Sequence, residues 1–74
     1  MSALPLISGD RCVAILRSFG YIGGRQRGSH VRLEAPHRPP VTVPLHHELD
    51  RGTLRAILRA AEITAEVFVA AAQH

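Results

Sequence analysis

The feature that most constrains the fold is a glycine turn that leads into a short alternating segment, Arg27-Gly28-Ser29-His30-Val31-Arg32-Leu33. Successive side chains of a β-strand point to opposite faces, so burying Val31 and Leu33 would place His30 and Arg32 on the other face. The segment therefore predicts a strand with one core face and one open face. An imidazole held in the open beside guanidinium groups suits proton transfer next to a phosphate.

Two further segments have strand character, so that strands are expected over about residues 21 to 25, 29 to 34 and 40 to 44. The turns between them are expected at 26–28 and 35–39, and connections this short predict an antiparallel meander. Pro44 has no amide hydrogen to donate, which favours an edge position for the third strand. The side chains expected to face the core are those of Ile22, Val31, Leu33, Val41 and Val43. Those expected to face outward are Tyr21, Arg25, His30, Arg32, Glu34 and Thr42.

A first helix is expected over about residues 9 to 19. Ser8 can cap it, Asp10 complements its dipole, and Gly20 can supply a left-handed stop. Helical spacing predicts a buried stripe of Cys12, Ile15, Leu16 and Phe19, opposite a solvent-facing set of Arg11, Ala14 and Ser18. Cys12 is accordingly interpreted as a core residue rather than a reactive thiol.

Two more helices are expected at the C-terminal end. Asp50 can cap a helix over about residues 51 to 61, with Leu54, Ile57, Leu58 and Ala61 as its buried stripe. Thr64 can cap the last helix, with Ile63 and Phe68 at the two positions of a hydrophobic staple.

The resulting order, α-β-β-β-α-α, predicts the α+β class, with a three-stranded antiparallel sheet covered by helices on one face only. A chain of 74 residues can form one domain, here 1–74, and is too small for a deeply enclosed site.

The net charge of +3 and a pI near 10.5 favour a polyanionic partner, either nucleic acid or an acidic protein. All nine basic residues are arginines. Arginine suits bidentate contacts with phosphate or carboxylate, although a biased genome composition would have the same effect.

Cys12 is the only cysteine, so no internal disulfide can form and a reducing cytoplasm is expected. Neither a charged leader nor an apolar stretch of roughly 20 residues is found, so no export and no membrane partner are expected.

The chemistry that this pattern favours is the cleavage of RNA without a metal. The RNA's own 2′-OH can attack the adjacent phosphorus if one group removes its proton and another protonates the leaving oxygen. Histidine performs either task near neutral pH, which makes His30 the candidate catalytic residue. Arg25, Arg27 and Arg32 are the nearest candidates to hold the phosphate.

Other interpretations of the polar residues are weaker. Ser29 as a nucleophile with His30 as its base is disfavoured, because adjacent strand residues point to opposite faces. A metal site at the run from His46 to Asp50 is disfavoured, because neighbouring side chains rarely converge on one ion; neither a metal nor a cofactor is predicted. His46 follows the third strand and is a candidate second proton carrier or RNA contact. The histidines interpreted as solvated loop residues are His37, His47 and His74.

Arg51, Arg55 and Arg59 recur four residues apart and would share one face of the second expected helix. This arginine stripe either follows a phosphate backbone or is a solvated face that pairs locally with Glu62.

Several blocks, taken together and in this order, carry a resemblance to a known family: LPLISG at 4–9, RQRGSHVRL at 25–33, VTVPLH at 41–46 and GTLRAILR at 52–59. They resemble the HicA toxins, small mRNA interferases of bacterial toxin-antitoxin pairs whose fold is similar to the double-stranded RNA-binding domain. The resemblance implies cleavage of mRNA with His30 as the catalytic histidine. The residues expected to contact the RNA are Arg25, Arg27, Gly28, Ser29, Arg32 and His46.

The resemblance also implies a partner, an antitoxin of the HicB type that covers the histidine face. The chain alone is then expected to be a monomer, and a hetero-oligomer with its antitoxin. One departure stands out: the family usually ends its second helix with an alanine-glycine pair, whereas this chain has Ala61-Glu62. A non-glycine residue in a left-handed turn costs about 1 kcal/mol.

Two rival functions belong to other classes. A binding module of the same fold would grip double-stranded RNA without cutting it, which requires a wide basic surface. An interaction subunit would use the basic face chiefly to dock an acidic protein.

Overall fold

The structure, a computed structural model, describes residues 4–73 and confirms both the predicted order of elements and the α+β class. The elements are α1 (Gly9–Arg17), β1 (Ile22–Arg27), β2 (His30–Ala35), β3 (Arg38–Pro44), α2 (Arg51–Ala61) and α3 (Ala65–Ala72). No helix among the described residues has the length and apolar content needed to cross a bilayer.

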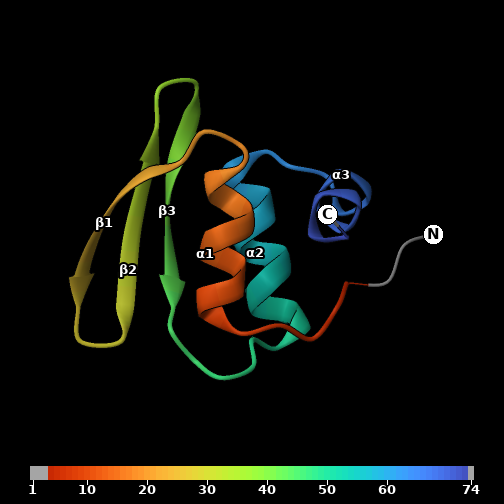
Figure 1. The fold of residues 1–74 in the computed structure, drawn as a ribbon, viewed down its shortest axis with the longest axis horizontal. Helices are drawn as coiled ribbons and strands as arrows, with labels where there is room; N and C mark the ends of the chain where they lie inside the picture. The colour runs from red at the N-terminus through yellow and green to blue at the C-terminus, as the bar shows by residue number, and fades with distance from the viewer. Residues whose placement is uncertain (1–3, 74) are drawn as a thin grey trace.

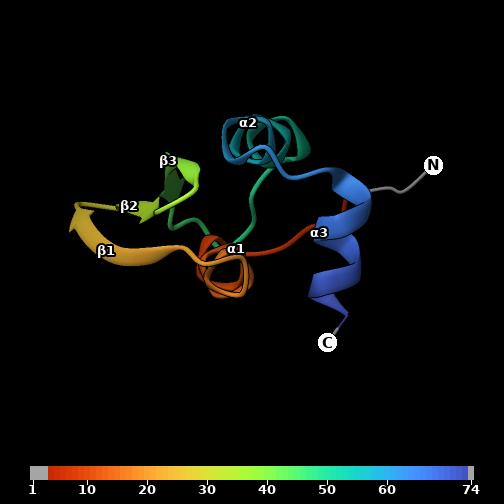
Figure 2. The same cartoon turned by 90° about the horizontal axis from the view of Figure 1, so that it is seen from above.

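The three strands form one antiparallel sheet in the order β1-β2-β3, so β3 is an edge strand as Pro44 predicted. Figures 1 and 2 show α1 and α2 on the same side of this sheet, with α3 at the far end of the molecule. The opposite face of the sheet is left uncovered by the described helices, as expected.

Alternation along β2 and β3 agrees with the prediction. Val31 and Leu33 are buried while His30 and Arg32 are exposed, and Thr42 is exposed between two buried valines of β3. Among the helical residues, the predicted buried stripes of α1 and α2 reach the core, together with Ile63 and Phe68. Phe19 is the exception, because it lies beyond the end of α1 and is only partly buried against the core.

The prediction is wrong at the start of β1. Tyr21, expected outside, is 1% exposed, and Ile22, expected inside, is 62% exposed. The cause is the glycine pair: Gly23 and Gly24 have φ angles of 92° and 125°, and the register with β2 shifts between Gly23 and Arg25. This bulge breaks the period of two that the prediction assumed.

The environment of Tyr21 explains its burial. Its hydroxyl donates to the carbonyl oxygen of Pro39 at 2.7 Å, which satisfies the polar end of a side chain placed in the core. Burial raises the pKa of the Tyr21 phenol.

Both predicted turns are shorter in the structure. Gln26 and Arg27 belong to β1, and a two-residue turn of Gly28 and Ser29 connects it to β2. Gly28 has a φ of 56°, and glycine at the first central position suits tight hairpins of this length. The second turn is likewise confined to two residues, 36–37. Because β1 continues to Arg27, the open face of the sheet gains one further outward-facing position, that of Arg27.

The predicted helix caps are confirmed. The side chains of Ser8, Asp50 and Thr64 accept hydrogen bonds from the backbone N–H groups of Arg11, Thr53 and Val67, respectively. The second helix has the predicted bounds, whereas α1 ends at Arg17, two residues early, followed by a left-handed Gly20 with a φ of 98°.

Cys12 is a core residue, as predicted. Its side chain is fully buried, and this burial raises the pKa of the thiol to about 12. The thiol therefore stays protonated near neutral pH and is shielded from solvent.

Candidate functional site

The register of the sheet brings the polar side chains of the open face into two adjacent rows. His30 pairs with Arg27 across the β1-β2 hairpin. Two residues further along β2, Arg32 pairs with Arg25 on one side and with Thr42 on the other. Directly opposed residues have Cβ atoms about 4.5–5.5 Å apart, so each row forms a cluster of side chains on one face.

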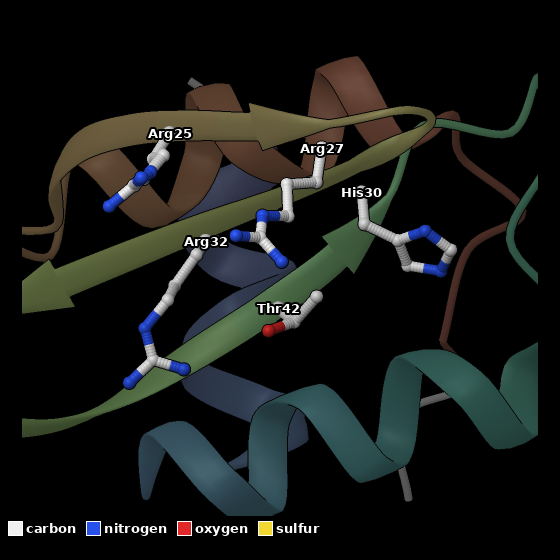
Figure 3. Close-up of a pocket in the computed structure, with 5 residues that line it drawn as sticks. All are labelled: Arg25, Arg27, His30, Arg32 and Thr42. Atoms are coloured by element: carbon white, nitrogen blue, oxygen red, sulfur yellow. The ribbon is translucent and has the colours of Figure 1, made fainter.

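These five residues line a hollow of about 310 Å³, which we name the cationic hollow. Its lining residues are Arg25, Arg27, His30, Arg32 and Thr42. Figure 3 shows their side chains on one face of the sheet, with the imidazole at the turn end of the hairpin. The structure thus brings together four of the predicted site residues and adds Thr42.

The three guanidinium groups of the cationic hollow make no hydrogen bond to another described residue. Other arginines of the chain are engaged in structural bonds, such as those from Arg11, Arg17, Arg38 and Arg51 to backbone carbonyls. Arg25, Arg27 and Arg32 therefore present their donors to solvent, where their summed charge attracts an anion. A phosphate in the hollow would be met by planar donors that suit bidentate contacts.

His30 is held at the first position of β2 by the tight turn before it. The carbonyl of Ser29 accepts a hydrogen bond from the backbone N–H of Leu45, which ties the turn to the end of β3. The imidazole itself is exposed, as predicted for an uncovered sheet face. It is therefore open to a ligand that occupies the cationic hollow.

A second hollow of about 320 Å³ lies between β3 and α2, and we name it the neutral groove. Its lining residues are His30, Val41, Thr42, Pro44, Thr53, Ala56, Ile57 and Ala60. His30 and Thr42 line both hollows, so the two are contiguous.

The sequence prediction missed the neutral groove and the site position of Thr42. Alternation along β3 already placed Thr42 outward, and this was the available signal. No local pattern indicates the groove, because it forms only where α2 packs beside β3.

The remaining candidate residues lie around the hollows rather than in them. Gly28 and Ser29 form the turn beside His30. His46 lies in the loop after β3, where its carbonyl accepts from the N–H of Gly9. It lines neither hollow.

His37 and His47 are exposed, as expected for solvated histidines, and His74 lies outside the described residues. Within residues 4–73, no group of three or more His, Cys, Asp or Glu side chains is arranged so that it could hold a metal ion.

The arginine stripe of α2 does not line either hollow. At 3.6 residues per turn, Arg51, Arg55 and Arg59 project from a different side of the helix than Ala56 and Ala60. Arg51 also donates from Nε to the carbonyl of Leu4 at 3.1 Å, which ties the start of α2 to the N-terminal segment.

Comparisons of the chain with solved structures and with protein-family models agree with each other. No curated protein is similar enough to count as a match. Among solved structures, a chain of a toxin-antitoxin complex from Streptococcus pneumoniae matches with a TM-score of 0.67 and 33% sequence identity, covering 77% of this chain and 98% of that one. The family model of the HicA toxin of bacterial toxin-antitoxin systems matches residues 9–63, which include every strand and the residues of both hollows. The chain therefore belongs to the HicA toxin family.

Proposed function

We propose that this protein is the toxin of a toxin-antitoxin pair, a metal-independent endoribonuclease that cleaves mRNA. The observation that carries the proposal is an exposed imidazole in a hollow that three guanidinium groups share. The membership of the HicA family supports it.

The proposed reaction uses the RNA's own nucleophile. The 2′-oxygen loses its proton to a base and forms a bond to the adjacent phosphorus, while the bond from phosphorus to the 5′-oxygen breaks and that oxygen gains a proton. The products are a 2′,3′-cyclic phosphate and a 5′-hydroxyl. His30 serves as the base or as the acid in this step. A second group performs the other proton transfer.

The arginines supply electrostatic stabilisation. Negative charge grows on the phosphoryl oxygens as the 2′-oxygen attacks, and donors already in place stabilise that charge better than mobile water does. We assign this role to Arg25, Arg27 and Arg32. Further RNA contacts are assigned to Gly28 and Ser29 at the turn, and to His46 beyond β3.

The proposed partner is an antitoxin of the HicB type. The S. pneumoniae relative was solved as a toxin-antitoxin complex, which supports a partner of this kind for the present chain. An antitoxin that covers the cationic hollow would block access to His30 and place acceptors against the arginines. The chain is proposed to act as a single domain, monomeric alone and hetero-oligomeric with this partner in the cytoplasm.

The test compares purified wild-type protein with His30→Ala and with His37→Ala as a matched control, since His37 is exposed in the turn between β2 and β3. In excess chelator, wild type and His37→Ala should cleave single-stranded mRNA. The His30→Ala variant should fold with an unchanged melting temperature and lose activity by about 10²-fold or more. Activity of His30→Ala equal to that of wild type would overturn the assignment.

Measuring RNA binding together with RNA cleavage decides between a ribonuclease and a protein that only binds RNA. If the wild-type protein bound duplex RNA with strong salt dependence and left all RNA intact after long incubation, the chain would be a non-catalytic double-stranded-RNA-binding module. Growth arrest on expression, relieved by the product of a neighbouring reading frame, would support the toxin role over that of an interaction subunit.

A further inference from the structure

The neutral groove differs in chemistry from the cationic hollow that it adjoins. Apart from His30, its walls carry no ionisable side chain. On α2 they consist of Thr53, the methyl groups of Ala56 and Ala60 and part of Ile57, and on β3 of Val41, Thr42 and Pro44. The groove therefore suits a neutral group with apolar faces rather than an anion.

The relation of the two hollows matches the two parts of a nucleotide. A nucleotide joins an anionic phosphate to a neutral, flat base through the ribose, and here a cationic hollow joins a neutral groove at His30. At about 320 Å³ the groove reaches the lower end of the range for small-molecule sites, roughly 300 Å³. A ligand that filled both hollows would place its ribose beside the imidazole.

We propose that the neutral groove binds the base of the nucleotide adjoining the phosphate held in the cationic hollow, and that Ala56 and Ala60 leave the space for it. This inference rests on the proposed function, because the phosphate must be that of an RNA substrate. Single-stranded RNA supplies such bases, since unstacked bases bind to apolar and aromatic surfaces of proteins.

The hydroxyl groups in the groove determine which hydrogen bonds the edge of a base can form there. The Thr53 hydroxyl donates to the carboxylate of Asp50 at 3.1 Å, so its oxygen acts toward a ligand as an acceptor. The Thr42 hydroxyl is exposed and can rotate to donate or accept. The groove therefore offers a base edge one acceptor, at Thr53, and one hydroxyl that can take either role, at Thr42.

The small size of the two alanines offers a direct test. Leucine at position 56 or 60 fills the groove from an exposed helical position, and leucine is a good helix former, so α2 should be retained. The matched control is Ala14→Leu, an exposed alanine of α1 that lines neither hollow. Thermal melts of all three variants check the fold.

The substrates are oligonucleotides with a single ribose in a 2′-deoxy chain, so that cleavage occurs at one bond. They carry a natural base or an abasic site, on the 5′ or the 3′ side of that bond. For the wild type, an abasic site on one side should lower kcat/KM by roughly 5- to 30-fold. In Ala56→Leu and Ala60→Leu, kcat/KM for the natural substrate should fall to a similar level. An abasic site should then lower the kcat/KM of these variants little further. Ala14→Leu should behave as the wild type.

The outcomes separate this inference from the proposed function. The proposed base site is wrong if the wild type cleaves and Ala56→Leu and Ala60→Leu cleave natural substrates with the same kcat/KM. It is also wrong if an abasic site lowers kcat/KM as much in these variants as in the wild type. In both cases the proposed ribonuclease function is retained. If the wild type cleaves none of the natural-base substrates and no mRNA, the proposed function fails and the inference fails with it.

Discussion

The guanidinium of Arg38, at the start of β3, donates from Nη1 to the carbonyl oxygen of Ala61, the last residue of α2, at 3.1 Å. The same atom donates to the carbonyl of Glu62 at 3.2 Å, and the guanidinium carbon lies 5.6 Å from the ring centroid of Phe19. One side chain thus joins β3 to the C-terminal end of α2 and to the segment after α1. Because β3 and α2 are the walls of the neutral groove, this side chain helps to set the groove's width.

Truncation of the Arg38 side chain should destabilise the protein. Arg38→Ala removes the hydrogen bonds to the carbonyls of Ala61 and Glu62 and one cation-π interaction, and we expect the free energy of unfolding to fall by about 1–2 kcal/mol in urea titrations. Arg59→Ala, an exposed arginine of α2, should change it by less than about 0.5 kcal/mol. Equal effects of the two substitutions would contradict the role of Arg38.

The end of α2 stores a small strain that a substitution can release. Glu62 has φ 59° and ψ 41°, the only positive φ of a non-glycine residue among those described. Glu62→Gly should therefore raise the free energy of unfolding by about 0.5–1 kcal/mol, since glycine adopts this conformation without a steric penalty. Glu66→Gly, inside α3, should instead lower it by a similar amount. A loss of stability in Glu62→Gly would show that its side chain matters more than its backbone.

Gly9 is required for the approach of α1 to the end of β3. A Cβ atom added at this position would overlap the carbonyl oxygen of Pro44 and lie 2.8 Å from the Cα of Leu45, both backbone atoms that cannot move aside alone. Gly9→Ala should lower the free energy of unfolding by about 2 kcal/mol or more, as measured by chemical denaturation. For comparison, Gly52→Ala meets only the carboxylate of Asp50, at 3.3 Å, and should change stability by less than about 1 kcal/mol. A tolerated Gly9→Ala would mean that α1 can shift away from β3.

The cap of α2 should make stability depend on pH in the acid range. Hydrogen bonds from the Thr53 backbone N–H and then its hydroxyl lower the pKa of Asp50 below its ordinary value of 3.8. A carboxyl with a lowered pKa in the folded state contributes stability that is present above pH 3.8 and is lost as the pH falls through the folded-state pKa.

The variant Asp50→Asn retains a capping oxygen without the charge. Thermal melts should therefore show the wild type more stable than Asp50→Asn near neutral pH, with the difference shrinking as the pH falls below about 4. A difference that stayed constant with pH would exclude the carboxylate as its source.

RNA affinity should depend on the cationic hollow and not on the arginine stripe. In a His30→Ala background that leaves RNA intact, Arg32→Gln should weaken binding to single-stranded RNA. It should also reduce the slope of log K against log salt by about 0.7 for each phosphate that the variant no longer neutralises. Arg59→Gln should leave both quantities unchanged. If Arg59→Gln lowered the affinity and the salt slope as much as Arg32→Gln does, RNA would also contact the arginine stripe.

Features that depend on neighbours in the chain could be predicted from the amino-acid sequence. The caps at Ser8, Asp50 and Thr64 are bonds to residues three positions away, and the exposure of His30 follows from the period of two along β2. The arginines of the open face and the order of the elements were accessible in the same way.

Features that depend on contacts between distant segments emerged only from the packed fold. The bulge at Gly23 and Gly24 exchanged the expected positions of Tyr21 and Ile22, because strand register is set by pairing with β2 and not by alternation alone. The hydrogen bond from Arg38 to Ala61 and the groove between β3 and α2 join segments far apart in sequence, and their geometry follows from how the helices pack on the sheet. Local patterns carry no information on such packing, because its energy arises only once distant surfaces meet.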